Sequence, residues 1–218
     1  MRGCLRITSG YRRQSGLGPV LYQVECSAHF LDRVNHNKAP WNNNGGVERV
    51  VIVGSGGAGK TTLAVELGRR TGLPVLHLDR FYWRPGWERL PNNEWADVQA
   101  EQLEGEHWIV DGNYSSTYAI RFQRADTIIM LVTPKWRCTL RVLRRQLASR
   151  GREVQAVGCP ERFDLEFLRY VWRYPRESRT LLDAAIDQYR DTAEVIELSS
   201  PSAVRAFLGR VQGAKPPD

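Results

Sequence analysis

One glycine-rich segment carries the clearest chemistry in the chain. Residues 54–61 read Gly-Ser-Gly-Gly-Ala-Gly-Lys-Thr and match the phosphate-loop pattern G-x-x-x-x-G-K-[ST] at every fixed position. Small side chains leave backbone N–H groups free to surround a polyphosphate, and a helix beginning near Gly59 would direct its N-terminus at the same anion. We expect Lys60 to reach the outer phosphates and the Thr61 hydroxyl to bind Mg²⁺. Nucleotide contacts are predicted for Gly54, Ser55, Gly56, Gly57, Ala58, Gly59, Lys60, Thr61 and Thr62.

Two aspartates at the ends of predicted strands are the candidate acids. Asp79 and Asp111 each follow an apolar run, and the carboxyl ends of parallel strands converge on one ligand crevice. The fourth predicted strand ends without an acid, so these two are expected to hold the metal, its bound water or the acceptor hydroxyl. Asp111 is predicted to be a metal ligand together with Thr61. For either aspartate, a helix-cap or turn role is the alternative.

A stretch of basic residues supplies candidate phosphate ligands. Between positions 135 and 152 the chain has seven basic residues and no acid: Lys135, Arg137, Arg141, Arg144, Arg145, Arg150 and Arg152. Arginines stabilise the charge that develops on a transferring phosphoryl group, so a lid of helix and loop is predicted over about 137–160. Arg144 and Arg150 are the candidates chosen from it. A solvated basic face and a nucleic-acid-binding patch are the two alternatives.

Strands and helices alternate from residue 48 onward, which is typical of a parallel sheet with crossover helices. Strands are predicted over 50–53, 74–78, 108–110, 127–132 and 195–198, and helices from about 59 to 70, 92 to 103, 135 to 149, 164 to 189 and 202 to 211. The fold class is therefore predicted to be α/β: a three-layer P-loop NTPase fold with five parallel strands, similar to nucleotide kinases, and a helical lid.

Several side chains are predicted to be buried on these helices or to mark where the helices begin and end. The helix over 135–149 is expected to bury an apolar stripe at i, i+4, i+7 and i+11: Trp136, Leu140, Leu143 and Leu147. Gly72 is expected to cap the first helix, and Asp164 to begin a helix that buries Leu165, Leu168 and Val171, which Pro175 would break or kink. An aromatic loop over 80–87 either stacks a base, encloses an acceptor or fastens the loop to the sheet.

Composition narrows the class of protein. The chain has 218 residues, a net charge of +7 from 31 Lys+Arg against 24 Asp+Glu, and no apolar run long enough to span a bilayer. This balance favours anionic partners such as nucleotides, phosphorylated molecules or nucleic acid. The four cysteines, without C-x-x-C or zinc-like spacing, are expected to be reduced thiols of a cytoplasmic protein. The four scattered histidines are expected to be surface or packed residues.

The first 46 residues differ from the rest of the chain. They are rich in arginine and glycine, have few acids, and are similar in this to a transit peptide, but a poorly ordered extension is the preferred interpretation. Translation starting near Val47 is another. The predicted organisation is an extension over 1–46, a P-loop kinase-like domain over 47–213 and a tail over 214–218.

Four motifs in order resemble the DNA topology modulation proteins, a family of small adenylate-kinase-like P-loop kinases. They are Leu-Asp-x-x-Tyr-Trp-x-Pro-Gly-Trp at 78–87, Trp-Ile-Val-Asp-Gly-Asn-Tyr at 108–114, Arg-x-x-x-Ala-Asp-Thr at 121–127 and Gly-Cys-Pro-Glu-Arg-Phe-Asp at 158–164. The resemblance implies ATP and Mg²⁺ as ligands, a mobile lid, Asp111 near Mg²⁺, and Arg121 near an acceptor phosphate. The segment 152–157 departs from the family pattern, which bears on lid chemistry and substrate choice.

These observations predict an ATP-dependent phosphotransferase that acts on a nucleotide or another small molecule. Lys60, Asp79, Asp111, Arg121, Arg144 and Arg150 are its predicted catalytic residues. The alternative is an ATP-dependent regulator that binds nucleic acid through the basic stretch 135–152. A GTPase and a transporter ATPase are disfavoured, because the chain has neither an Asn-Lys-x-Asp guanine signature in place nor a Leu-Ser-Gly-Gly-like segment.

Overall fold

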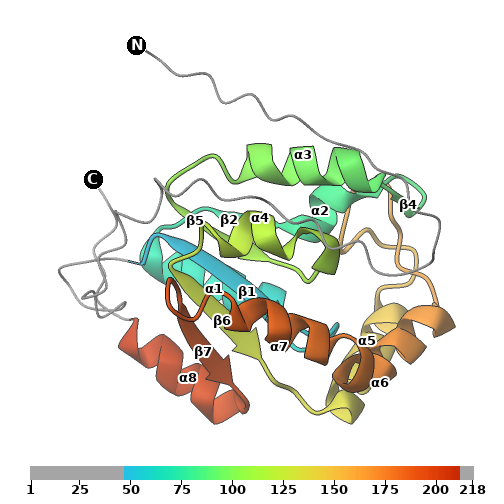
Figure 1. The fold of residues 1–218 in the computed structure, drawn as a ribbon. Helices are drawn as coiled ribbons and strands as arrows, with labels where there is room; N and C mark the ends of the chain where they lie inside the picture. Colours follow the sequence, from blue (N-terminus) through green and yellow to red (C-terminus); the bar gives the residue numbers. More distant parts are fainter. Residues whose placement is uncertain (1–46, 212–218) are drawn as a thin grey trace.

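Five parallel strands form the centre of the structure, in the order β2-β5-β1-β6-β7 (Figure 1). The computed structural model describes residues 47–211, and the predictions for the extension 1–46 and the tail 214–218 lie outside this range. The strands are β1 Arg49–Gly54, β2 Val75–His77, β5 Trp108–Asp111, β6 Thr127–Leu131 and β7 Glu194–Leu198. The predicted five-stranded parallel sheet is confirmed. Within the described range, no helix is both long enough and apolar enough to cross a membrane.

Helices cover both faces of this sheet and make three layers. They are α1 Lys60–Thr71, α2 Leu78–Tyr82, α3 Asn92–Gln102, the 3-10 helix η2 Ser115–Thr117, α4 Tyr118–Phe122, α5 Lys135–Ala148, α6 Leu165–Glu177, α7 Arg179–Asp187 and α8 Pro201–Arg210. One apolar cluster joins the sheet to α1 and α8, and a second joins the opposite face to α3, α4 and α7.

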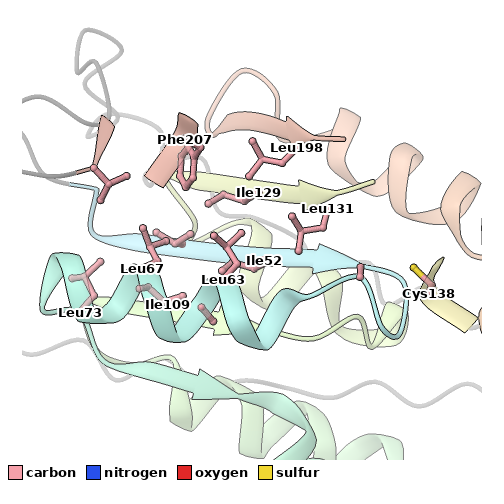
Figure 2. Packing of buried hydrophobic residues seen from close by; sticks show 14 of the residues in the cluster. Ile52, Leu63, Leu67, Leu73, Ile109, Ile129, Leu131, Cys138, Leu198 and Phe207 are labelled. Carbon is pink, nitrogen blue, oxygen red and sulfur yellow. The ribbon is translucent and has the colours of Figure 1, made fainter. Parts of the chain in front are cut away.

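Alternate residues of β1 enter the two clusters. Ile52 packs with Leu67 of α1 and Phe207 of α8 (Figure 2). Val51 points to the other side, where Trp95 and Leu182 lie. Strand side chains alternate between faces, and both faces here are covered by helices, so all four apolar residues at 50–53 are fully buried. This burial on both faces of the sheet explains why the sequence of β1 is a continuous apolar run.

The segment after β2 differs from the prediction. The strand stops at His77, and the next residues form the short helix α2 instead of continuing to a strand end at Asp79. The expected aromatic loop is the end of α2 followed by an antiparallel hairpin of β3 Trp83–Arg84 and β4 Glu88–Arg89. We call residues 83–89 the hairpin.

The apolar stripe predicted for α5 was wrong. The buried row of this helix is Cys138, Val142 and Gln146, whereas Trp136 is 54% exposed. Leu140 and Leu147 are also exposed, and only Leu143 of the predicted stripe packs against the core. The reason is close packing on the phosphate loop: a Cβ at Gly57 would lie 2.5 Å from the carbonyl oxygen of Cys138. Such an approach favours the smaller cysteine and valine side chains on the contacting face.

Helix ends mostly follow the predicted signals. Gly72 adopts the left-handed conformation and its N–H donates to the Gly68 carbonyl, which confirms it as the C-cap of α1. The Asp164 carboxylate accepts from the N–H of Phe167 and caps α6, as predicted. Of the residues expected to point inward, Leu168 and Val171 are buried but Leu165 is 48% exposed. Pro175 lies inside α6, which continues to Glu177 before α7 begins.

Candidate functional site

The phosphate loop lies between β1 and α1 in a conformation that requires glycine. Gly54, Gly57 and Gly59 have φ angles of +141°, +76° and +106°, a region that other residues rarely adopt. A Cβ at Gly54 would also lie 2.6 Å from the carbonyl oxygen of Leu131. Gly59 is the N-cap of α1, and the first turn of this helix holds no acid. Its unpaired N–H groups are thus left to an anion.

Lys60 is bonded to the loop and is influenced by the charges of both candidate acids. Its Nζ donates to the carbonyl oxygens of Gly54 at 2.9 Å and Ser55 at 3.1 Å. Burial lowers the pKa of this ammonium below the usual lysine value, while the negative charges of Asp79 and Asp111 raise it. The fold therefore brings together the lysine and the two aspartates that were predicted from separate strands.

Asp111 is held from two sides at the end of β5. The Thr61 hydroxyl donates to its Oδ2 at 2.7 Å, and His77 Nδ1 lies 2.6 Å from its Oδ1. Its side chain is 5% exposed. Hard cations such as Mg²⁺ take oxygen ligands, and a site that combines one carboxylate, one hydroxyl and nucleotide phosphates suits them. The predicted metal pair is thus adjacent and has fitting chemistry. The fold is that of a P-loop NTPase.

Within residues 47–211, no group of three or more His, Cys, Asp or Glu side chains could hold a metal ion. A Mg²⁺ ion beside Thr61 and Asp111 would therefore need its remaining ligands from phosphate oxygens and water, as nucleotide-dependent enzymes usually provide them. The described cysteines, Cys138 and Cys159, are both free and buried.

His77 was not predicted to take part in the site. It pairs with Asp111 in the parallel register of β2 and β5, which places the two side chains next to each other. A histidine two residues before Asp79 was the only signal in the sequence. The pairing itself could not be read from the chain, because α2, the hairpin and α3 lie between β2 and β5.

Asp79 lies in the first turn of α2, where the Tyr114 hydroxyl donates to its Oδ1 at 2.5 Å. Burial and the Asp79 charge raise the pKa of this tyrosine, so its hydroxyl keeps its proton. Tyr114 has a φ of +36°, in the left-handed region. The preceding Asn113 accepts a hydrogen bond from the N–H of Gly54 at 3.0 Å. The segment after β5 thus links the phosphate loop to Asp79.

Arg121 is placed differently from what the family resemblance implied. Its side chain is fully buried, and its guanidinium donates to Gln99, Thr117 and the carbonyl oxygen of Asn113. Burial lowers its pKa to about 10. In this structure the buried Arg121 side chain donates hydrogen bonds to the segment after β5. It does not lie on an open surface beside the phosphate loop.

Two other arginines approach the phosphate loop from α5. Arg141 Nη1 lies 3.2 Å from the carbonyl oxygen of Gly57 and 3.3 Å from that of Ala58. The charge of Arg145, one helical turn later, lowers the pKa of Lys60. Arg144 and Arg150 are exposed, as Arg141 is, but within the described chain no hydrogen bond or ion pair joins either of them to this loop. The i, i+4 spacing of Arg141 and Arg145 was the available signal.

Comparisons with known proteins find one partial family match and several similar solved structures. The chain matches the family model for isopentenyl transferase over residues 47–84, which include the phosphate loop but not Asp111. It is similar to the shikimate kinase of Acinetobacter baumannii in complex with shikimate, at 18% identity and a TM-score of 0.49, over 76% of this chain and 90% of that chain. A sugar kinase from Janibacter sp. HTCC2649 has 15% identity and a TM-score of 0.43, over 76% and 94% of the two chains. No curated protein matches. The resemblance to DNA topology modulation proteins stays a prediction.

Proposed function

We propose that the protein is an ATP- and Mg²⁺-dependent phosphotransferase that acts on a hydroxyl or phosphate of a nucleotide or another small molecule. The observation that carries this proposal is the convergence of Lys60, Thr61, Asp111 and Asp79 on one end of the sheet. A glycine-rich turn alone would require no carboxylates beside it. Phosphoryl transfer needs a cation-lined cradle, a metal site and a group that orients the acceptor, and these residues supply the three.

Each residue has a separate role in the proposed reaction. The loop N–H groups and Lys60 bind the β- and γ-phosphates, and Lys60 exchanges its present carbonyl partners for phosphate oxygens. Thr61 and Asp111 would hold Mg²⁺, which neutralises charge on the phosphates when bound. Arg141 and Arg145 stabilise the negative charge of the transferring group.

Asp79 is assigned to the acceptor. Its Oδ1 accepts from Tyr114, which fixes the carboxylate and leaves Oδ2 to accept the proton of an acceptor hydroxyl. The aromatic side chains around Tyr114 lie on this side of the site: Tyr82 is 4.5 Å and Trp95 4.9 Å from its ring centroid. The acceptor is therefore expected to bind next to α2 and the hairpin.

The direct test is an acceptor screen with ATP labelled at the γ-phosphate. Wild-type protein should transfer label to at least one nucleotide or small-molecule acceptor in the presence of Mg²⁺, and Lys60→Met should abolish the transfer. Lys135→Met is the matched control, because Lys135 lies over the Trp172 ring of α6 and, within residues 47–211, no hydrogen bond or ion pair joins its side chain to the loop. Transfer that survives in Lys60→Met would contradict the mechanism.

Binding of nucleic acid through the basic stretch 135–152 has weaker support. Arg141 donates to the phosphate loop and Arg145 is paired with Glu161, so these two basic side chains already have partners within the protein. Anisotropy with labelled single- and double-stranded DNA at low salt decides this alternative, because phosphate-driven binding is strongest there. Tight binding unaffected by Lys60→Met would favour it over the phosphotransferase.

A further inference from the structure

The loop that joins α5 to α6 is fastened to the hairpin. We call residues 149–164 the lid loop; Figure 1 shows it reaching from the α5–α6 pair to the region of β4. Three hydrogen bonds join the two segments. The Gly86 N–H donates to the Gly158 carbonyl at 2.8 Å, Trp87 Nε1 donates to the Pro160 carbonyl at 3.0 Å, and Cys159 Sγ donates to the Arg84 carbonyl at 3.1 Å.

The backbone at this junction is shaped for close contact. Gly158 has a φ of +71°, and a Cβ on it would lie 2.7 Å from Cβ of Pro85. On the hairpin, Gly86 and Trp87 have φ angles of +83° and +66°, which turn the Trp87 indole toward the lid loop. A left-handed tryptophan is uncommon and persists only where its surroundings hold it. The two motifs Trp-x-Pro-Gly-Trp and Gly-Cys-Pro therefore have a shared structural role.

The lid loop places a buried acid next to this junction. Glu161 is 3% exposed, and its backbone is held by hydrogen bonds to Gly151 and Arg152. Its carboxylate accepts from Gln155 Nε2 at 2.8 Å and lies 3.1 Å from Arg145 Nε. A carboxylate removed from water needs a cation and hydrogen bonds to remain charged. Among the described residues, Arg145 is the cation in ion-pair range of Glu161.

Arg145 also has a guanidinium donor that does not bond to the described part of the protein. Its Nη2 is buried and has no hydrogen-bond partner within residues 47–211, while its charge acts on Lys60 of the phosphate loop. A buried guanidinium donor is costly to leave unpaired, and an anionic oxygen beside Lys60 would satisfy it. The ion pair with Glu161 lies at Nε, on the other side of the same guanidinium, and this Nε likewise has no hydrogen-bond partner within residues 47–211.

We propose that Glu161 is a positioning residue: it holds the Arg145 guanidinium toward the transferring phosphate, and the docking of the lid loop on the hairpin keeps Glu161 in place. This inference rests on the proposed phosphotransferase function. It connects the hairpin, which lies on the acceptor side of the site through Tyr82 and Tyr114, with the arginine on the nucleotide side. The orientation of the Arg145 guanidinium then depends on the contact between the lid loop and the hairpin.

A double-mutant cycle in the full-length protein tests this role. Glu161→Gln keeps the shape and the bond from Gln155 but removes the charge opposite Arg145. We expect kcat for γ-phosphate transfer, or for Mg²⁺-dependent ATP hydrolysis, to fall about tenfold, with KM for ATP changed by less than about twofold. Arg145→Ala should lower kcat at least as much, and Glu161→Gln should have no further effect in the Arg145→Ala background. Glu153→Gln, an exposed acid of the same loop, is the matched control and should leave kcat unchanged.

Three outcomes would overturn the inference. These are a folded Glu161→Gln protein with wild-type kcat, an equal loss of kcat in the presence and absence of Arg145, and a loss confined to KM. Should Glu161→Gln fail to fold, Trp87→Phe takes its place, since it removes only the N–H to Pro160; a wild-type kcat in that variant would also overturn the inference. Calorimetry with ATP and Mg²⁺ on the wild-type protein distinguishes failure of the proposed function from failure of this inference alone. Absence of binding rejects the proposed function and this inference together, whereas wild-type turnover with a silent Glu161→Gln rejects this inference alone.

Discussion

The Thr61 hydroxyl donates a 2.7 Å hydrogen bond to Asp111 Oδ2, although 50 residues separate them along the chain. The register of the sheet explains the contact. β1 and β5 are parallel neighbours with Ile52 opposite Asp111, so the end of β5 lies beside the loop that leaves β1. His77 arrives at the same place because β2 pairs with the other edge of β5. One hydroxyl and one carboxylate are thereby available to a single metal ion.

Asp111→Asn should remove the Mg²⁺ dependence of nucleotide binding while the fold remains. The amide oxygen still accepts from Thr61, but the charge that attracts the cation is gone. We expect the affinity for ATP in the presence of Mg²⁺ to fall at least about tenfold, toward the value measured in EDTA. Titration calorimetry with and without Mg²⁺ checks this. Asp97→Asn on the exposed side of α3 is the control, and an unchanged Mg²⁺ effect in Asp111→Asn would reject the metal assignment.

Gly57→Ala should impair both folding and binding. The residue has a φ of +76°, and the added methyl would meet the Cys138 carbonyl at 2.5 Å. Strain of this kind costs about 1–3 kcal/mol of unfolding free energy, and the displaced loop should lose its affinity for ATP. Urea denaturation and calorimetry give the two values. Gly105→Ala, where no atom lies within 4 Å, should leave binding unchanged.

Arg121→Lys distinguishes a buried support from a phosphate ligand. The guanidinium donates to several acceptors that a lysine cannot reach at once, so we expect a loss of about 2–3 kcal/mol of unfolding free energy. Denaturant unfolding measures it. A protein of wild-type stability in which only KM for the acceptor rises would instead support the role that the family resemblance implied.

Leu140→Ala and Val142→Ala form a matched pair on α5. Leu140 is 47% exposed and Val142 is 1% exposed, although only the leucine belonged to the predicted stripe. Truncating the buried valine should cost about 2 kcal/mol of unfolding free energy, and truncating the exposed leucine less than about 0.5 kcal/mol. Thermal or urea unfolding of both variants decides the matter, and a larger loss at Leu140 would mean that this face is covered.

The local parts of the site could be predicted from the sequence because their causes are local. Glycine at positions 54, 57 and 59 follows from the backbone angles of the loop, and Lys60 and Thr61 follow from their place in the first turn of α1. The order of strands and helices also follows, since apolar runs and periodic patterns report the burial of each element. Asp111 was placed correctly at the end of its strand because the ends of parallel strands share one edge.

Tertiary packing decided which side chains meet. The pairing of His77 with Asp111 depends on which strands are neighbours, and strand order is not encoded in either segment alone. The face of α5 that turns inward was set by the close approach of Gly57 to Cys138, so Arg141 contacts the phosphate loop while Leu140 and Leu147 remain exposed. The periodicity of a helix sequence shows that the helix has distinct faces, but it does not show which segment each face packs against. That segment is distant in the chain, and its shape determines which face of the helix can pack on it.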